Sequence, residues 1–140
     1  MSESLTFHYD VDGENFTSAG QASVRVKKNL RQLGVDPETI RRVSIAMYEG
    51  EINMVIHANG GSADIIVDDT GVTIILADTG PGIADIDKAM QEGYSTARDE
   101  VRSLGFGAGM GLPNMKRYTD EMVIDSVPGE GTTVTMKVNF

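Results

Sequence analysis

The chain contains no cysteine and no tryptophan, and aromatic residues make up only 6% of its 140 residues. Without cysteine, disulfide bonds and thiolate metal sites are excluded, which suits a protein kept in a reducing compartment. No stretch approaches the roughly 20 consecutive apolar residues that a membrane-spanning helix needs, and the N-terminus has no basic region followed by an apolar run. We therefore expect a cytoplasmic protein that does not associate with a membrane.

Positive charge is also scarce. The chain has 12 Lys and Arg against 21 Asp and Glu, a formal net charge of −9. An acidic balance without a long basic block opposes nonspecific attraction to nucleic acid, so we expect no nucleic-acid partner. A bound phosphate would have to be held by backbone amides and a metal ion rather than by a cationic patch.

The periodicity of apolar residues predicts the order of helices and strands. At this length we expect one domain, residues 1–140, with a substantial core. Strands that come in hairpins, together with grouped helices, are typical of an α+β two-layer sandwich. We expect a mixed, mainly antiparallel sheet of about five strands under three helices. Strands are predicted at 5–11, 63–67, 72–77, 121–127 and 133–138, and helices at 16–33, 37–58, 83–91 and 112–118.

The helix predicted at 37–58 is apolar around much of its circumference, which places it at the centre of the fold. Its main apolar stripe consists of Ile40, Val43, Met47, Gly50 and Met54. A glycine inside a helix costs roughly 1 kcal/mol relative to alanine. We expect a close approach of another backbone to compensate for that cost.

Two polar residues stand on the same face of this apolar helix. Glu49 and Asn53 are four positions apart, so a carboxylate and an amide lie one turn from each other. Glu51 points to another side, and we assign it no catalytic role. His57 continues the stripe of Asn53 by one turn, where a structural role is favoured over a contact with phosphate.

Three glycine-rich loops follow, at 78–82, 105–111 and 129–132. They contain neither G-x-x-x-x-G-K-[ST] nor G-x-G-x-x-G, which disfavours P-loop and Rossmann sites. The chain also has no H-E-x-x-H or Cys/His spacing for zinc, and no G-x-S-x-G elbow for a catalytic serine. Alternating glycines before a helix still expose backbone amides that can bind an anion, although a loop without a ligand has the same pattern.

Asp78 lies where a buried strand meets the first glycine loop. It could make a local turn hydrogen bond, or it could accept a hydrogen bond from a ligand amino group in an apolar pocket. Residues 92–111 show no sustained periodicity, and an irregular segment of about 20 residues is typical of a functional lid or of disorder. We predict a mobile lid over about 84–108.

Two features outside these motifs have a simpler interpretation. His8 falls on the polar side of the first predicted strand, where we expect a solvated histidine. Lys27, Lys28 and Arg31 lie near the C-terminal end of the first predicted helix, where cations complement the helix dipole. A partner-docking face is the alternative for these three cations.

Four short motifs occur in a set order: Glu49-x-x-x-Asn53, Asp78-x-Gly80-x-Gly82, Gly107-Ala-Gly109-Met-Gly111-Leu112 and Gly129-Glu-Gly131-Thr132. In this order they resemble the N-box and the glycine boxes of the GHKL (Bergerat) ATP-binding fold, which is shared by gyrase, the Hsp90 chaperones, histidine kinases and the mismatch-repair protein MutL. The Gly93-Tyr94-Ser95-Thr96 segment and Leu112-Pro113 are most similar to the single-domain serine kinases of bacterial partner switching, the anti-sigma factors and stressosome switch kinases. The likeness covers nearly the whole chain.

The resemblance implies a role for each matching residue. Asn53 would coordinate Mg²⁺ on the phosphates of ATP, Asp78 would accept from the adenine amino group, and Thr132 would support adenine through its hydroxyl. Gly80 and Gly82 would let the backbone pass close to the nucleotide, while the amides around Gly107, Gly109, Gly111 and Leu112 would cradle the phosphates. In the serine-kinase branch, Glu49 would be the general base.

The function implied is that of an ATP- and Mg²⁺-dependent protein serine/threonine kinase that phosphorylates a small regulatory protein of the STAS (anti-sigma-antagonist) fold. Two other functions stay open: a stand-alone histidine-kinase catalytic domain acting on a separate acceptor, and a non-catalytic ATP-gated binding module. Direct binding of a sigma factor and formation of a homodimer also stay open.

Overall fold

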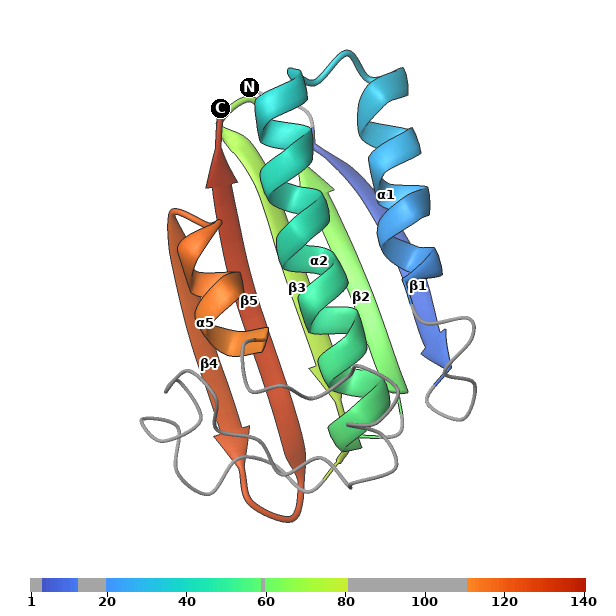
Figure 1. Ribbon diagram of the computed structural model, residues 1–140, viewed down its shortest axis with the longest axis vertical. Coiled ribbons are helices and arrows are strands. Elements are labelled where there is room, and N and C mark those ends of the chain that lie inside the picture. The colour runs from blue at the N-terminus through green and yellow to red at the C-terminus, as the bar shows by residue number, and fades with distance from the viewer. Residues whose placement is uncertain (1–3, 13–19, 59, 81–110) are drawn as a thin grey trace.

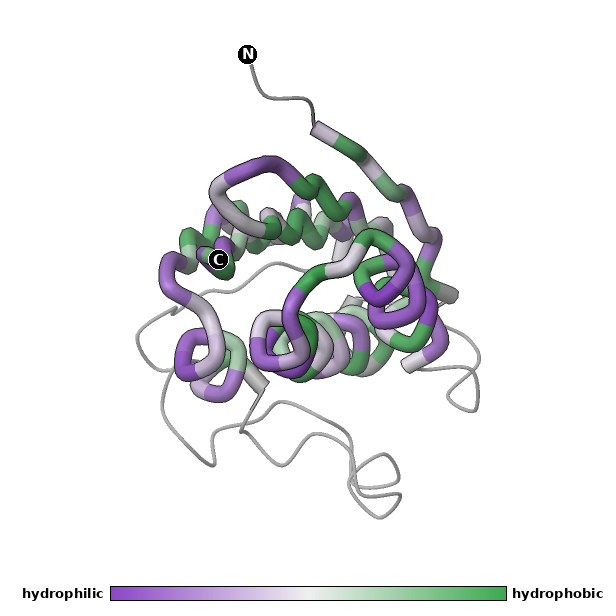
Figure 2. The backbone as a smooth tube through the Cα atoms, turned by 90° about the horizontal axis from the view of Figure 1, so that it is seen from above, coloured by the Kyte–Doolittle hydropathy of each residue, from purple (hydrophilic) through white to green (hydrophobic). Residues whose placement is uncertain are grey.

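The computed structural model describes residues 4–12, 20–58, 60–80 and 111–140, and all structural statements below concern these ranges. They form a five-stranded sheet with the strand order β1-β2-β3-β5-β4, and three helices, α1, α2 and α5, cover one face of it (Figure 1). Viewed edge-on, the sheet and the helices form two layers (Figure 2). The predicted α+β two-layer sandwich is therefore confirmed.

The bounds of the elements follow the predicted pattern closely. The strands are β1 Leu5–Asp12, β2 Gly60–Val67, β3 Gly71–Asp78, β4 Glu121–Val127 and β5 Gly131–Asn139, and the helices are α1 Gln21–Gln32, α2 Pro37–Ala58 and α5 Gly111–Arg117. Every strand pair among them is antiparallel, so the sheet is antiparallel throughout rather than mixed. The helix predicted at 83–91 lies outside the described ranges, as does the start of the helix predicted at 16–33.

Helix α2 lies at the centre of the helical layer, as its all-round apolar character predicts. Its stripe is buried, with Val43 and Met47 fully inaccessible to solvent. It packs against α1 on one side and α5 on the other, and its buried face contacts β2, β3 and β5. Position 50 is therefore enclosed on several sides.

Gly50 does not lie against another backbone, so that expectation is wrong. A Cβ at this position would lie 2.1 Å from Cδ1 of Leu76 and 3.3 Å from Cε of Met115. Both side chains are almost completely buried, at 2% and 1% exposure. The glycine thus makes room for two core side chains, one from β3 and one from α5.

The C-terminal end of α1 agrees with the sequence pattern. Gly34 follows the helix with φ of +78°, and its backbone N–H donates to the carbonyl of Arg31 at 3.1 Å. A left-handed glycine just past the last turn is a common helix terminator. Within the described ranges, none of the helices combines the length and apolar character that crossing a bilayer demands.

Candidate nucleotide-binding site

Glu49 and Asn53 lie in the C-terminal half of α2, and both side chains are partly exposed. Oε1 of Glu49 accepts a long hydrogen bond of 3.4 Å from Nδ2 of Asn114 in α5. Leu112 and Met115, at 6% and 1% exposure, anchor α5 to the core. The structure thereby places the carboxylate of Glu49 beside the helix that directly follows the second glycine box.

Asp78 lies at the end of β3, opposite Thr132 in the register of β3 and β5. Its Oδ1 accepts two backbone N–H groups, that of Gly80 at 2.9 Å and that of Thr132 at 3.2 Å. The local turn hydrogen bond considered above is therefore present, and it uses the same oxygen as the contact across the strands. Among the described residues no hydrogen bond falls on Oδ2, so this oxygen can still accept one from a ligand.

Thr132 is 8% exposed, and its hydroxyl shares a hydrogen bond of 2.9 Å with Oγ of Ser126. Ser126 also donates to the carbonyl of Gly131 at 3.3 Å. The sequence interpretation had not included Ser126 in the site. The available signal was its place in the final hairpin, where β4 and β5 pair Ser126 with Thr132.

Gly131 brings the last glycine box into close contact with β3. Its φ is +140°, and a Cβ there would lie 2.2 Å from the carbonyl oxygen of Asp78. No real Cβ tolerates such a contact, and the atom it would meet belongs to backbone that is held in a sheet ladder. The glycine at this position is what allows Thr132 and Asp78 to lie side by side.

Several predicted site residues cannot be placed. Gly82, Gly107, Gly109 and the lid predicted at about 84–108 lie outside the described residues. Gly111 is the first residue of α5, and His57 lies in the last turn of α2 with its side chain outside the description. The cradling of phosphate by the second glycine box, and the roles of the other residues in binding, remain predictions.

Glu51 has a structural function that the sequence interpretation missed. Its side chain is 3% exposed, and its two carboxylate oxygens accept the backbone N–H groups of Gly20, Ala22 and Ser23 at 2.8, 3.2 and 3.0 Å. These groups are the unpaired donors at the N-terminus of α1, whose N-cap Gly20 provides no capping side chain. The favourable end of the helix dipole adds to the hydrogen bonds. Glu51, which lies between Glu49 and Asn53 in the sequence of α2, thus attaches the start of α1 to this part of α2.

The antiparallel sheet with helices α1, α2 and α5 on one face is an open α+β sandwich, and Asp78 and Thr132 lie paired at its strand ends. The family model described as "Histidine kinase-like ATPase domain" matches residues 15–138, and the chain belongs to this family. The resemblance inferred from the four motifs is therefore confirmed.

The chain is similar to named members of this family over most of its length. It is 37% identical over 110 residues to an anti-sigma F factor of Caldanaerobacter subterraneus, which covers 75% of this chain and 73% of that protein. It is also 37% identical over 108 residues to the serine/threonine-protein kinase RsbT of Bacillus subtilis, covering 74% of this chain and 75% of RsbT.

Two solved structures support the fold. The RsbU and RsbW domains of a Mycobacterium tuberculosis protein match 96% of this chain with a TM-score of 0.65 at 18% identity, and the match spans 32% of that longer chain. The SiaB–SiaC complex of Pseudomonas aeruginosa contains a chain that matches 97% of this one with a TM-score of 0.56 at 12% identity. At these identities the likeness concerns the fold alone.

Proposed function

We propose that the chain is an ATP- and Mg²⁺-dependent protein serine/threonine kinase that phosphorylates a small regulatory protein of the STAS type and so controls partner switching. The observation that carries the proposal is the position of Glu49. Its carboxylate is partly exposed and lies beside α5, next to the end of the predicted phosphate-binding loop. Family membership and the similarity to RsbT and to anti-sigma F factors support the same reaction.

ATP would be recognised at two ends of the site. At the adenine end, Oδ2 of Asp78 would accept from the exocyclic amino group, while Oδ1 is held by Gly80 and Thr132. A carboxylate fixed in this way presents its remaining oxygen in one direction. Rejection of guanine follows, because guanine has a carbonyl oxygen where adenine has its amino group, and two facing acceptors repel each other.

Mg²⁺ fits the donor set at the other end. This ion usually keeps several waters and takes only one or two protein oxygens together with the phosphates. The side-chain oxygen of Asn53, one turn from Glu49 on α2, can be such a ligand. Among the residues described, no group of three or more His, Cys, Asp or Glu is arranged so that it could hold a metal ion, so phosphate oxygens would supply most of the coordination. When bound, Mg²⁺ would neutralise phosphate charge.

In the transfer step, Glu49 would accept the proton of the acceptor hydroxyl while that oxygen forms a bond to the γ-phosphorus of ATP. The bond between this phosphorus and the bridging oxygen breaks, and ADP leaves with the electron pair. Phosphoryl transfer depends on such positioning and on a base within hydrogen-bond reach of the nucleophile. Asn114, which donates to Oε1 of Glu49, would orient the carboxylate.

The proposal is tested by incubating the protein with Mg-ATP and the products of neighbouring genes, STAS-fold proteins first. We expect acid-stable phosphate on one partner, with the label lost in Glu49→Gln while ATP binding is retained. Acid-labile phosphate would instead identify a histidine-kinase catalytic domain. Nucleotide-dependent binding without transfer would identify an ATP-gated binding module. The nucleotide assignment itself is wrong if Asn53→Ala and Asp78→Asn both leave ATP affinity unchanged.

A further inference from the structure

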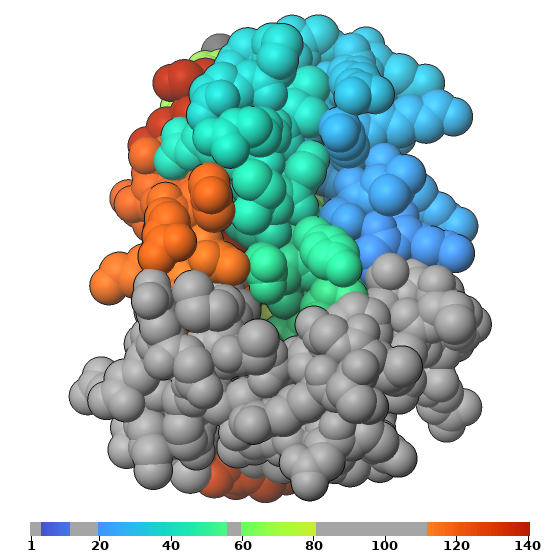
Figure 3. All heavy atoms as spheres, viewed as in Figure 1, coloured from blue at the N-terminus to red at the C-terminus, as the bar shows by residue number. Residues whose placement is uncertain are grey.

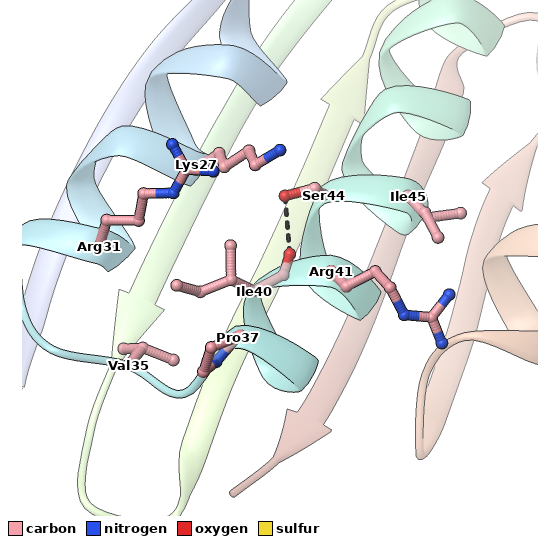
Figure 4. Close-up of a pocket in the computed structure, with 8 residues that line it drawn as sticks. All are labelled: Lys27, Arg31, Val35, Pro37, Ile40, Arg41, Ser44 and Ile45. Atoms are coloured by element: carbon pink, nitrogen blue, oxygen red, sulfur yellow. Dashed lines mark hydrogen bonds between the residues drawn. The ribbon is translucent and has the colours of Figure 1, made fainter.

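A groove of about 420 Å³ lies between α1 and the first turns of α2, outside the candidate nucleotide site. It is lined by Lys27, Arg31, Val35, Pro37, Ile40, Arg41, Ser44 and Ile45 (Figure 4). Ile40, on its floor, is 13 residues from Asn53 on the same helix, which corresponds to roughly 20 Å along the axis. Helices α1 and α2 lie side by side on one face of the molecule (Figures 1 and 3). The residues of α2 that line the groove belong to its first turns, at the end of the helix far from Asn53.

The two walls of the groove differ in character. Lys27 extends from α1 toward α2, Arg31 lies along α1 with its guanidinium beside Lys27, and both residues are exposed (Figure 4). The α2 side is mainly apolar, with Pro37, Ile40 and Ile45, and it also includes the cation Arg41. Its one hydroxyl, that of Ser44, already donates to the carbonyl of Ile40 at 2.7 Å. An occupant would therefore meet the two cations of α1 on one side and a mainly apolar surface on the other, where the charge of Arg41 is paired with Glu38.

Lys27 and Arg31 lie on a helix that carries no acidic residue. Helix α1 contains four basic residues and no acidic one, in a chain whose formal net charge is −9. Within the described ranges neither side chain forms an ion pair. Arg41, by contrast, is held by Glu38 at 3.0 Å and lies over the ring of Tyr118, with 5.6 Å from Cζ to the ring centroid. The uncompensated charge of the groove thus belongs to α1.

We infer that this groove docks an acidic, amphipathic segment of a partner protein. Carboxylates of the segment would pair with Lys27 and Arg31, and its apolar side chains would cover the apolar floor at Val35, Pro37 and Ile45, which is partly or fully exposed. A small anion would leave that apolar floor in contact with water, and the negative net charge of the chain opposes docking on an anionic membrane. The inference does not depend on the kinase activity, because the groove and its charges are separate from Glu49 and Asn53.

The test uses a fluorescein-labelled synthetic peptide that carries glutamate on one face of a helix and leucine on the opposite face. Fluorescence anisotropy would measure its binding to the whole protein, and we expect affinity that falls as salt rises. The double variant Lys27→Glu/Arg31→Glu should weaken binding at least about tenfold. Lys27→Gln/Arg31→Gln should give a smaller loss, since it removes attraction without adding repulsion.

A matched control comes from the same helix. Arg25→Glu/Lys28→Glu changes the net charge by the same amount, but neither residue lines the groove. We expect less than about a threefold effect on peptide affinity, and unchanged ATP affinity in all variants. The inference is overturned by any of three results: no binding up to about 1 mM peptide, equal losses in the groove and control variants, or undiminished binding to Lys27→Glu/Arg31→Glu. It is overturned as well if sedimentation shows that the groove variants disrupt a dimer while the peptide does not bind, because a second copy would then be the occupant.

Discussion

Asp78 and Thr132, 54 residues apart in the chain, lie opposite each other at the ends of β3 and β5, where Oδ1 of Asp78 accepts the backbone N–H of Thr132 at 3.2 Å. The same oxygen also holds the turn at Gly80. One oxygen of this carboxylate is therefore structural, and the other is the one we assign to adenine. Substitutions at Asp78 can separate these two roles.

Asp78→Asn should weaken ATP binding while leaving the fold intact. The asparagine keeps Oδ1 as an acceptor for Gly80 and Thr132, but its amide nitrogen presents donors where adenine needs an acceptor. We expect a loss of about ten- to hundredfold in ATP affinity, equivalent to about 1–3 kcal/mol. Calorimetric titration would measure affinity, and thermal unfolding would check stability. A melting temperature that falls steeply along with the affinity would contradict this division of roles.

Gly131→Ala should be far more damaging than Gly129→Ala, although both glycines have positive φ. Gly129, in the turn, has φ of +84° and no heavy atom within 4 Å of a Cβ, so alanine there should cost about 1–2 kcal/mol in strain alone. At Gly131 the added Cβ would meet the carbonyl of Asp78 at 2.2 Å. We expect a loss of about 3 kcal/mol or more in the free energy of unfolding, together with weaker ATP binding. Chemical denaturation of both variants checks this, and equal losses would refute the importance of the backbone contact.

Glu51→Ala should destabilise the protein by about 3 kcal/mol, because it leaves three backbone N–H groups at the start of α1 without an acceptor. Glu51→Gln keeps one carbonyl oxygen and should cost less, about 1–2 kcal/mol. The matched control is Glu121→Ala, an exposed glutamate on β4, for which we expect less than about 0.5 kcal/mol. Urea unfolding would measure all three, and a Glu51→Ala variant as stable as the control would contradict the capping role.

His8 should titrate above its ordinary pKa. Asp64 and Asp10 accept hydrogen bonds from its ring nitrogens at 2.7 and 3.1 Å, and both contacts raise the pKa of His8 above 6.5 by favouring the imidazolium. A pKa raised by folding contributes stability that is fully present below about pH 6.5 and is lost as pH rises through the raised value. Asp64→Asn should lower the pKa of His8 toward 6.5.

An NMR titration of the ring protons would measure this pKa, with His8→Gln assigning the resonances. The wild type should have a higher melting temperature than Asp64→Asn at pH 6, and this difference should shrink as the pH rises to 9. The difference falls in this direction because folding raises the pKa of His8. An unchanged pKa in Asp64→Asn would exclude Asp64 as the main cause. The exposed position also confirms the solvated strand histidine expected from the sequence.

The local sequence pattern was sufficient to predict the helices and strands of the fold. Alternating and helical apolar repeats predicted β1, α1 and α2, because each repeat reflects the side of one element that faces the core. A nearly continuous apolar run predicted β3, Pro113 indicated the start of α5, and turn residues marked the strands of the two hairpins. The hairpins β2–β3 and β4–β5 were also predictable, since turn residues join neighbouring strands. The pairings β1–β2 and β3–β5 were not, because they join segments far apart in the chain.

What the amino-acid sequence determined by itself is the set of elements, the family and the identity of the motif residues, since these depend on local periodicity and on short motifs. Only the tertiary structure decided which residues of different elements contact each other. Glu51 reaches amides 28–31 residues away, and Gly50 makes room for Leu76 and Met115 rather than for a backbone. Asp78 meets Thr132 only because β3 pairs with β5. Such contacts arise when elements pack against each other. The sequence pattern of one element does not show which residues of another element will lie against it.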